Sequence, residues 1–188
     1  DRPVSTTLIR VDNAYECVAK LLQLYDAVMQ FFVRPGEEIK WFEYWKETRM
    51  KWHLALGIPS EKYRYHDHEK LAHYANAATD IEFEFPFGFK ELEGIHSRTD
   101  FDLKRHQEFS GKKLQYFDSE LGESYVPYVI ETSIGLDRTF LAVFSHAYKE
   151  EKLEDGSERV VLALPRVLAP VKAAVLPLVK KDGMPEKA

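Results

Sequence analysis

Strict alternation of apolar and polar residues is the feature that most constrains how this chain can fold. It occurs in TDIEFEFPFGFKELEGIHS, residues 79–97. Apolar and acidic side chains take turns along its first half: Ile81, Glu82, Phe83, Glu84 and Phe85. A period of two puts the apolar side chains on one face of a β-strand and the carboxylates on the other. Because Pro86 and Gly88 then favour a turn, the stretch predicts an antiparallel hairpin.

The returning half of this hairpin carries two acids that predict a binding site. If the strand is regular, Glu91 and Glu93 share one face, and Gly94 leaves room for another group beside the backbone. Carboxylates one strand step apart repel each other unless a cation lies between them. The pair therefore favours a pocket for a positively charged group.

A second strand runs directly into a helix in VIETSIGLDRTF, residues 129–140. Glu131 and Ser133 share a face of the expected strand, and Gly135 ends it. Asp137 and Arg138 then open the expected helix, whose first N–H groups have no partner within the helix. This junction suits a ligand with an ammonium group and a phosphate or carboxylate. An ordinary solvated sheet face with a helix cap remains the alternative.

Helical patterns occupy much of the first third of the chain. Residues 12–28 begin as a helix and become a strand by Met29, which a turn at 34–37 ends. Residues 37–57 form a second helix closed by Gly57. Apolar residues, most of them aromatic, recur on one face of that helix and predict a buried stripe: Trp41, Phe42, Trp45, Trp52 and Leu56.

Two other patterns could carry function, and each has a plainer explanation. His66, His68 and His73 could be zinc ligands, but a fourth ligand is not apparent, so we predict no metal site there. Short basic clusters such as Lys112-Lys113 are flanked by acids and favour a solvated surface. Further on, residues 149–159 predict a charged turn, and residues 172–183 predict a buried strand.

The composition narrows the class of protein. The 188 residues carry a net charge of −5, which argues against a general nucleic-acid coat protein but permits a local basic patch. One cysteine, Cys17, excludes an internal disulfide and fits a reducing compartment. Without a long apolar run or a targeting signal at the N-terminus, we expect a cytoplasmic protein with no membrane association.

Longer stretches resemble the glycyl-tRNA synthetases, which are class II aminoacyl-tRNA synthetases. They are MQFFVRPGEE, KLAHYANAATDIEFEFPFGFKELEGIHSRTDFDL, YVPYVIETSIGLDRTFLAVFSHAY and LAPVKAAVLPLVKKDG. The tetrapeptide at 135–138 matches the third class II motif. The resemblance implies an α+β fold with an antiparallel catalytic sheet flanked by helices. It also implies ATP-dependent activation of glycine with Mg²⁺, followed by transfer to tRNA(Gly), in a family of homodimers.

The resemblance assigns residues to two ligands. The expected ATP-binding residues are Glu91, Leu92, Gly135, Leu136, Asp137 and Arg138, with Arg138 also the catalytic contact to the phosphates. The expected glycine-binding residues are Glu93, Glu131, Thr132, Ser133, Ile134 and Gly135. No metal-ligating residue is assigned.

The chain departs from the family in residues 24–28. Where the family carries Phe-Glu-Gln-Met-Glu, this chain has Leu-Tyr-Asp-Ala-Val, and neither the preceding arginine nor the dimer motif is visible. We expect an unmatched helical leader at 1–28, a partial catalytic core at 29–164 and the start of an anticodon-binding domain at 165–188. We also expect this chain by itself not to charge tRNA. The alternative function is a non-catalytic relative that binds nucleotide, RNA or protein.

Overall fold

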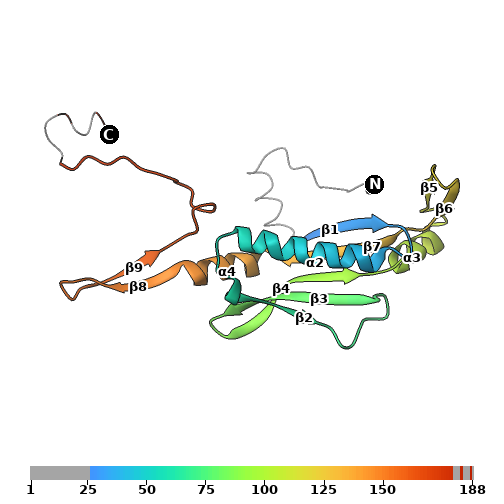
Figure 1. Cartoon of the computed structure of the whole chain (residues 1–188), viewed down its shortest axis with the longest axis horizontal. Coiled ribbons are helices and arrows are strands. Elements are labelled where there is room, and N and C mark those ends of the chain that lie inside the picture. Colours follow the sequence, from blue (N-terminus) through green and yellow to red (C-terminus); the bar gives the residue numbers. More distant parts are fainter. Residues whose placement is uncertain (1–25, 180–182, 184–186, 188) are drawn as a thin grey trace.

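A five-stranded antiparallel sheet organises the computed structural model, which describes residues 26–179, 183 and 187 (Figure 1). Its strands, in spatial order, are β1 (Asp26–Val33), β7 (Tyr128–Gly135), β4 (Gly88–Ser97), β3 (Ala77–Phe85) and β2 (Tyr63–Asp67). The expected α+β class is confirmed. The expected strand by Met29 is β1, which already begins at Asp26, so the helix predicted up to residue 28 is wrong for residues 26–28. The rest of that predicted helix lies outside the described residues.

Helix α2 (Glu38–Ala55) covers one face of this sheet. Phe31 of β1 packs against Trp41 and Trp45, with ring centroids 4.9 and 5.4 Å apart. Phe42 is buried in the same core, which contains the inward residues of β3, β4 and β7. The helix predicted at 37–57 is thus confirmed, with Gly57 at a φ of +85° after its end.

One member of the predicted aromatic stripe does not join the core. Trp52 is 40% exposed, and the guanidinium carbon of Arg49 lies 4.6 Å from its ring centroid. Near this end of α2 the inward position is held by His53, which is 1% exposed. The expectation that Trp52 is buried is therefore wrong, because the helix turns His53 toward the sheet in its place.

The predicted hairpin is confirmed as β3 and β4, but the returning strand is not regular. Ile81 pairs with Glu93 and Glu82 pairs with Glu91, so Leu92 is an extra residue on β4. Such a β-bulge reverses the side-chain alternation beyond it. Glu91 and Glu93 consequently point to opposite faces, and the expectation that they share a face is wrong.

The junction predicted near Gly135 is also confirmed. Strand β7 ends at Gly135, and α4 (Leu136–Ala147) begins at the next residue. The α4 N-terminus has no side-chain cap, although Thr139 donates a hydrogen bond from Oγ1 to the Gly135 carbonyl at 2.9 Å. The strand thus delivers the helix N-terminus directly to the end of the sheet.

The remaining elements lie outside the five-stranded sheet. They are η1 (Ser60–Lys62), α3 (Phe101–Ser110), and two hairpins, β5 (Tyr116–Asp118) with β6 (Glu123–Tyr125), and β8 (Tyr148–Lys152) with β9 (Glu158–Leu162). The charged turn predicted at 149–159 joins β8 and β9. No strand forms within 172–179, where Leu176 and Leu178 are 81% and 89% exposed, so the buried strand predicted there is wrong for the part that the structure describes. Among the described residues no helix is long and apolar enough to span a membrane.

Candidate active site

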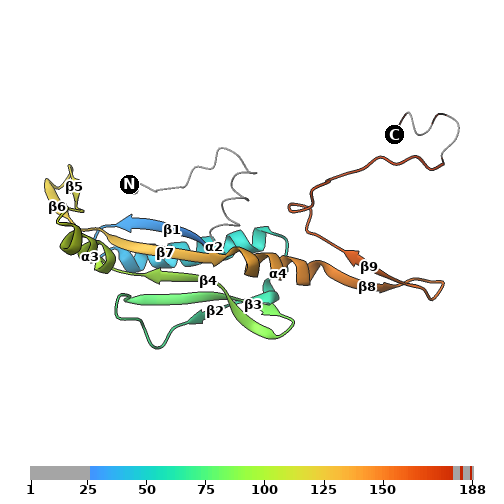
Figure 2. The same ribbon diagram turned by 180° about the vertical axis from the view of Figure 1, so that it is seen from behind.

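The face of the sheet opposite α2, here called the open face, carries polar residues from all five strands. Figure 2 shows the sheet from this side, with α2 lying behind β7. Paired residues point to the same side of an antiparallel sheet. The strand register therefore defines two rows of side chains across the open face. The first row is Gln30, Glu131, His96 and Ala78, and the second is Val28, Ser133, Gly94, Asp80 and His66.

Glu131 is the acid of the first row, and two side chains donate hydrogen bonds to it. Gln30 donates a hydrogen bond from Nε2 to its Oε2 at 3.1 Å, and Arg98 donates from Nη1 to its Oε1 at 3.2 Å. The side chain of Glu131 remains 16% exposed. Glu131 is thus a partly accessible carboxylate whose orientation is set by two donors.

Arg98 is itself fixed from several sides. It donates two hydrogen bonds to Asp102, at 2.6 and 3.2 Å, and its guanidinium lies 4.3 Å from the ring centroid of Tyr74. The hydrogen bond to Asp102 is the main reason why the pKa of Arg98 is raised. A guanidinium held in this way presents a rigid positive charge to Glu131.

The second row contains a space that a neighbouring ring fills. A Cβ added to Gly94 would lie 2.8 Å from Cε1 of His96 and 3.6 Å from Oδ1 of Asp80. Gly94 therefore makes room for the His96 imidazole, which answers what approaches its backbone. Asp80 is held in turn by Nε2 of His68 at 2.8 Å.

His96 is poised as a neutral side chain at the floor of the open face. Burial lowers its pKa from the ordinary value, and this effect exceeds the opposing influence of Asp80 and Glu131. Its Nδ1 is buried without a hydrogen-bond partner among the described residues. The imidazole thus lies near both Asp80 and Glu131 without adding a positive charge near neutral pH.

Arg138 and Glu91 meet beside these rows. Arg138, in the first turn of α4, donates from Nη1 to the Glu91 carbonyl at 2.9 Å and lies 3.3 Å from the Glu91 carboxylate. Both side chains are about half exposed, at 55% and 53%. The expected ATP residues therefore include one contacting pair, which connects β4 to the helix N-terminus.

Glu93 lies on the α2 side of the sheet and not on the open face. Its side chain is 0% exposed. Its Oε1 accepts a hydrogen bond from Nε of Arg49 at 2.5 Å, and its Oε2 lies 2.7 Å from Nε2 of His53. The expectation that Glu93 joins Glu91, Glu131 and Ser133 in one pocket is wrong, because the bulge at Leu92 turns it inward.

Several other expected contacts have side chains that point away from the open face. Thr132 and Ile134 belong to the α2 side of β7, and the side chain of Leu92 is in the core. Only the backbone atoms of these three residues are available on the opposite side. Gly135, Leu136 and Asp137 lie at the strand-to-helix junction, where the backbone N–H groups of the first turn begin.

The three histidines considered as metal ligands have other neighbours. The rings of His66 and His68 lie 5.8 Å apart, whereas His73 packs against Phe101 at 5.0 Å. Within residues 26–179 no group of three or more His, Cys, Asp or Glu side chains is arranged to hold a metal ion.

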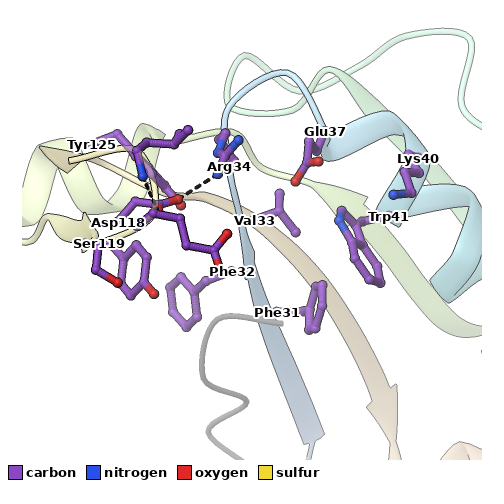
Figure 3. A pocket seen from close by; sticks show the side chains of 13 residues that line it. Phe31, Phe32, Val33, Arg34, Glu37, Lys40, Trp41, Asp118, Ser119 and Tyr125 are labelled. Atoms are coloured by element: carbon purple, nitrogen blue, oxygen red, sulfur yellow. Dashed lines mark hydrogen bonds and ion pairs between the residues drawn. The ribbon is translucent and has the colours of Figure 1, made fainter. Parts of the chain in front are cut away.

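A cavity of about 640 Å³ lies away from the predicted residues, at the end of β1 (Figure 3). Arg34 and Asp118 form an ion pair of 2.6 Å beside it, which ties the β5–β6 hairpin to β1. Trp41 and Tyr125 contribute aromatic walls. None of the residues expected to contact ATP or glycine lines this cavity.

Comparison with known proteins finds glycine–tRNA ligases that are similar to this chain. The chain is 54% identical over 172 residues to a glycine–tRNA ligase of Chlorobaculum tepidum, covering 91% of this chain and 36% of that protein. A glycine–tRNA ligase of Geobacillus thermodenitrificans is 56% identical over 157 residues, covering 82% of this chain and 34% of the relative. Over most of its length this chain is similar to a segment of the glycine–tRNA ligases. The resemblance found in the sequence is thereby confirmed.

The solved structures agree with this glycine–tRNA ligase assignment at the level of the fold. Seryl-tRNA synthetase from Pyrococcus horikoshii, a structure complexed with ATP, matches with a TM-score of 0.55 over 75% of this chain and 29% of that one. Its 22% identity shows the class II fold alone. No family model matches the chain. The chain spans about a third of the length of its curated glycine–tRNA ligase relatives.

Four residues of the candidate site were not singled out from the sequence of this chain. They are Gln30, Asp80, His96 and Arg98. A regular strand would have placed Glu93 on the same face as Glu91, whereas the bulge places Gly94 and His96 on that face. The cross-strand partners of Glu131 could not be seen without the register.

Proposed function

We propose that this chain contributes the part of a glycine–tRNA ligase active site where glycine is activated with ATP. In this reaction a glycine carboxylate oxygen attacks the α-phosphorus of ATP, and pyrophosphate leaves with the bonding electron pair. A hydroxyl at the 3′ end of tRNA(Gly) then attacks the carbonyl carbon of glycyl-adenylate, and AMP leaves with the bonding electron pair. The observation that carries the proposal is the Glu131 carboxylate, held by Gln30 and Arg98 in the row next to Ser133.

The open face has the chemistry that glycine requires. Glycine presents an ammonium and a carboxylate, and Glu131 is a partly exposed acid in a fixed orientation. Ser133 adds a hydroxyl in the adjacent row. A pocket with a fixed acid and limited space can bind the smallest amino acid while rejecting larger side chains by crowding. Glu93, being buried on the other face, is not part of this proposed pocket.

The Arg138 end of the open face suits the nucleotide. Attack on a phosphoryl group depends on positioning and on stabilising the developing charge. Arg138 supplies a half-exposed guanidinium, and the uncapped α4 N-terminus adds N–H groups beside it. ATP would therefore extend from the open face toward Gly135 and Arg138.

Mg²⁺ fits the same end of the site as a partner of the nucleotide. Magnesium in such sites is held by one or two carboxylates together with phosphate oxygens and water. The half-exposed Glu91 carboxylate beside Arg138 is a suitable ligand. When bound, the ion would neutralise phosphate charge.

One observation favours the alternative function, binding without activation. Val28 is 48% exposed and pairs with Ser133 on the open face, at the position where the family's Phe-Glu-Gln-Met-Glu stretch ends in an acid. An apolar side chain there cannot attract the glycine ammonium. A relative that binds nucleotide or adenylate without turnover would accept this replacement.

The remaining expectations stay predictions. They concern tRNA(Gly) as partner, the family's homodimer, a cytoplasmic location and the division of the chain at residues 28 and 164.

Calorimetric titration with a sulfamoyl analogue of glycyl-adenylate tests the proposal. The chain should bind the glycyl analogue more tightly than the corresponding alanyl analogue, because a methyl group would crowd the pocket. Glu131→Gln should weaken the glycyl analogue, and Glu84→Gln, an exposed acid paired with Lys62, is the matched control. Equal affinity for both analogues, or none for either, would contradict glycine recognition. ATP–pyrophosphate exchange with glycine then separates activation from binding alone.

A further inference from the structure

The buried triad of Arg49, Glu93 and His53 is the charged cluster that the proposed function leaves unused. Glu93 accepts hydrogen bonds through both oxygens, and neither it nor His53 reaches solvent. Burying a carboxylate is costly unless its partners satisfy it, and surface positions avoid that cost. A contribution to the stability of the fold alone therefore does not explain why these charged side chains are buried.

The triad lies next to the bulge that separates the two faces of β4. Glu93 is the first residue after the extra residue Leu92, and it pairs with Ile81, whereas Glu91 pairs with Glu82. Bulges next to functional sites re-aim side chains. Here the bulge directs Glu91 to the open face while Glu93 points to α2. A one-residue slip would exchange these directions.

Both ends of this short segment are held. On the inner side, Arg49 and His53 of α2 bind Glu93. On the outer side, Arg138 of α4 contacts the carbonyl and the carboxylate of Glu91. Aromatic contacts fix His53 in turn, with Trp52 at 5.0 Å and Tyr63 at 5.4 Å. Helices α2 and α4 thus contact β4 from opposite faces of the sheet, at Glu93 and Glu91 respectively.

From this geometry we infer that Arg49, Glu93 and His53 are positioning residues for the nucleotide end of the site. They keep the bulge in register, and the bulge keeps Glu91 against Arg138. The inference rests on the proposed function only for the identity of the ligand. The strand register that it explains is a property of the chain without any ligand. The triad touches neither nucleotide nor glycine.

Two substitutions at His53 separate positioning from stability. His53→Gln keeps an N–H donor within reach of Glu93, whereas His53→Leu fills similar space and leaves one carboxylate oxygen unpaired. Hydrogen exchange of backbone amides, followed by NMR on the full chain, is measured for residues 90–93 and for Val129 on β7. His53→Leu should accelerate exchange at 90–93 by about tenfold or more relative to Val129, and His53→Gln should not.

A second measurement links the register to the ligand. Titration with Mg²⁺ and a non-hydrolysable ATP analogue should show about tenfold weaker affinity in His53→Leu and affinity within about twofold of the parent in His53→Gln. If the parent does not bind the analogue, the proposed function fails, and the exchange measurement alone decides the positioning role. Acceleration spread evenly over the sheet, or absent at 90–93, would overturn the inference. If His53→Leu does not fold, Arg49→Lys is measured in the same way, since it keeps the charge but loses the guanidinium geometry.

Discussion

Arg138 contacts Glu91 twice, through a hydrogen bond of 2.9 Å to its carbonyl and an ion pair of 3.3 Å to its carboxylate. The two residues are 47 positions apart in the sequence. Their contact joins the first turn of α4 to the strand that carries the bulge. It is the point where the predicted ATP residues come together.

Replacing Arg138 with alanine should weaken nucleotide binding. A charge-assisted contact to phosphate contributes about 1.5–3 kcal/mol, so the loss should be roughly 10- to 100-fold in affinity for an ATP analogue. Calorimetric titration of parent and variant measures it. Arg159→Ala, which removes an exposed arginine paired with Glu151 on the β8–β9 hairpin, is the control. Unchanged affinity in Arg138→Ala would remove this residue from the site.

Arg98→Met should loosen the Glu131 carboxylate. Among the residues that the structure describes, Glu131 would keep Gln30 as its one donor, while Asp102 would lose its ion pair with Arg98. Affinity for the glycyl-adenylate analogue should fall by about 10-fold or more, since hydrogen bonds to charged groups contribute about 1.5–3 kcal/mol. Arg105→Met, which breaks an exposed pair with Glu108 on α3, should leave affinity unchanged. Equal losses in both variants would point to a general effect of charge.

The stability of the fold should depend on the ionisation of Glu93. Burial alone would raise its pKa, but the hydrogen bonds from His53 and Arg49 outweigh it and lower the pKa. The unfolded chain then binds the proton more readily, with a pKa of about 4.3. The stabilisation is complete above that value and is lost as the pH falls through the lower pKa of the folded state.

Glu93→Gln tests this dependence. Breaking a buried ion pair costs about 3–5 kcal/mol, so the variant should be less stable by that order at pH 7. The difference from the parent should begin to shrink below about pH 4, where the unfolded parent chain takes up the proton, and should go on shrinking as the pH falls through the lower pKa of the folded state. Urea unfolding across the pH range measures it, with Glu84→Gln as the exposed control. A stability difference that did not change with pH would show that the charge of Glu93 is unimportant.

Gly94→Ala should displace the His96 ring. The new methyl group would lie 2.8 Å from Cε1 of His96, which is closer than contact allows, so the imidazole must move toward solvent. Because burial is what lowers the pKa of His96, that pKa should rise toward its ordinary value of about 6.5. NMR titration of the ring proton reports the change. An unaltered His96 titration would mean that the ring does not fill this space.

Local sequence patterns determined most of the elements in this chain. The alternation in residues 79–85 is confirmed as β3, and the change of period at Gly135 is confirmed as the β7–α4 junction. These features are readable because side-chain periodicity and backbone preference act between near neighbours. The resemblance to glycine–tRNA ligases rested on the same stretches, and the relatives confirm it.

Only the tertiary structure decided which acids share a face. The bulge at Leu92 depends on how β4 pairs with β3, and one extra residue reverses every side chain that follows. This is why Glu93 is buried against α2 while Glu131 lies beside His96 on the open face. The same holds for Trp52, whose exposure depends on how α2 sits on the sheet. Such contacts join residues far apart in the chain, so no local pattern in the sequence encodes them.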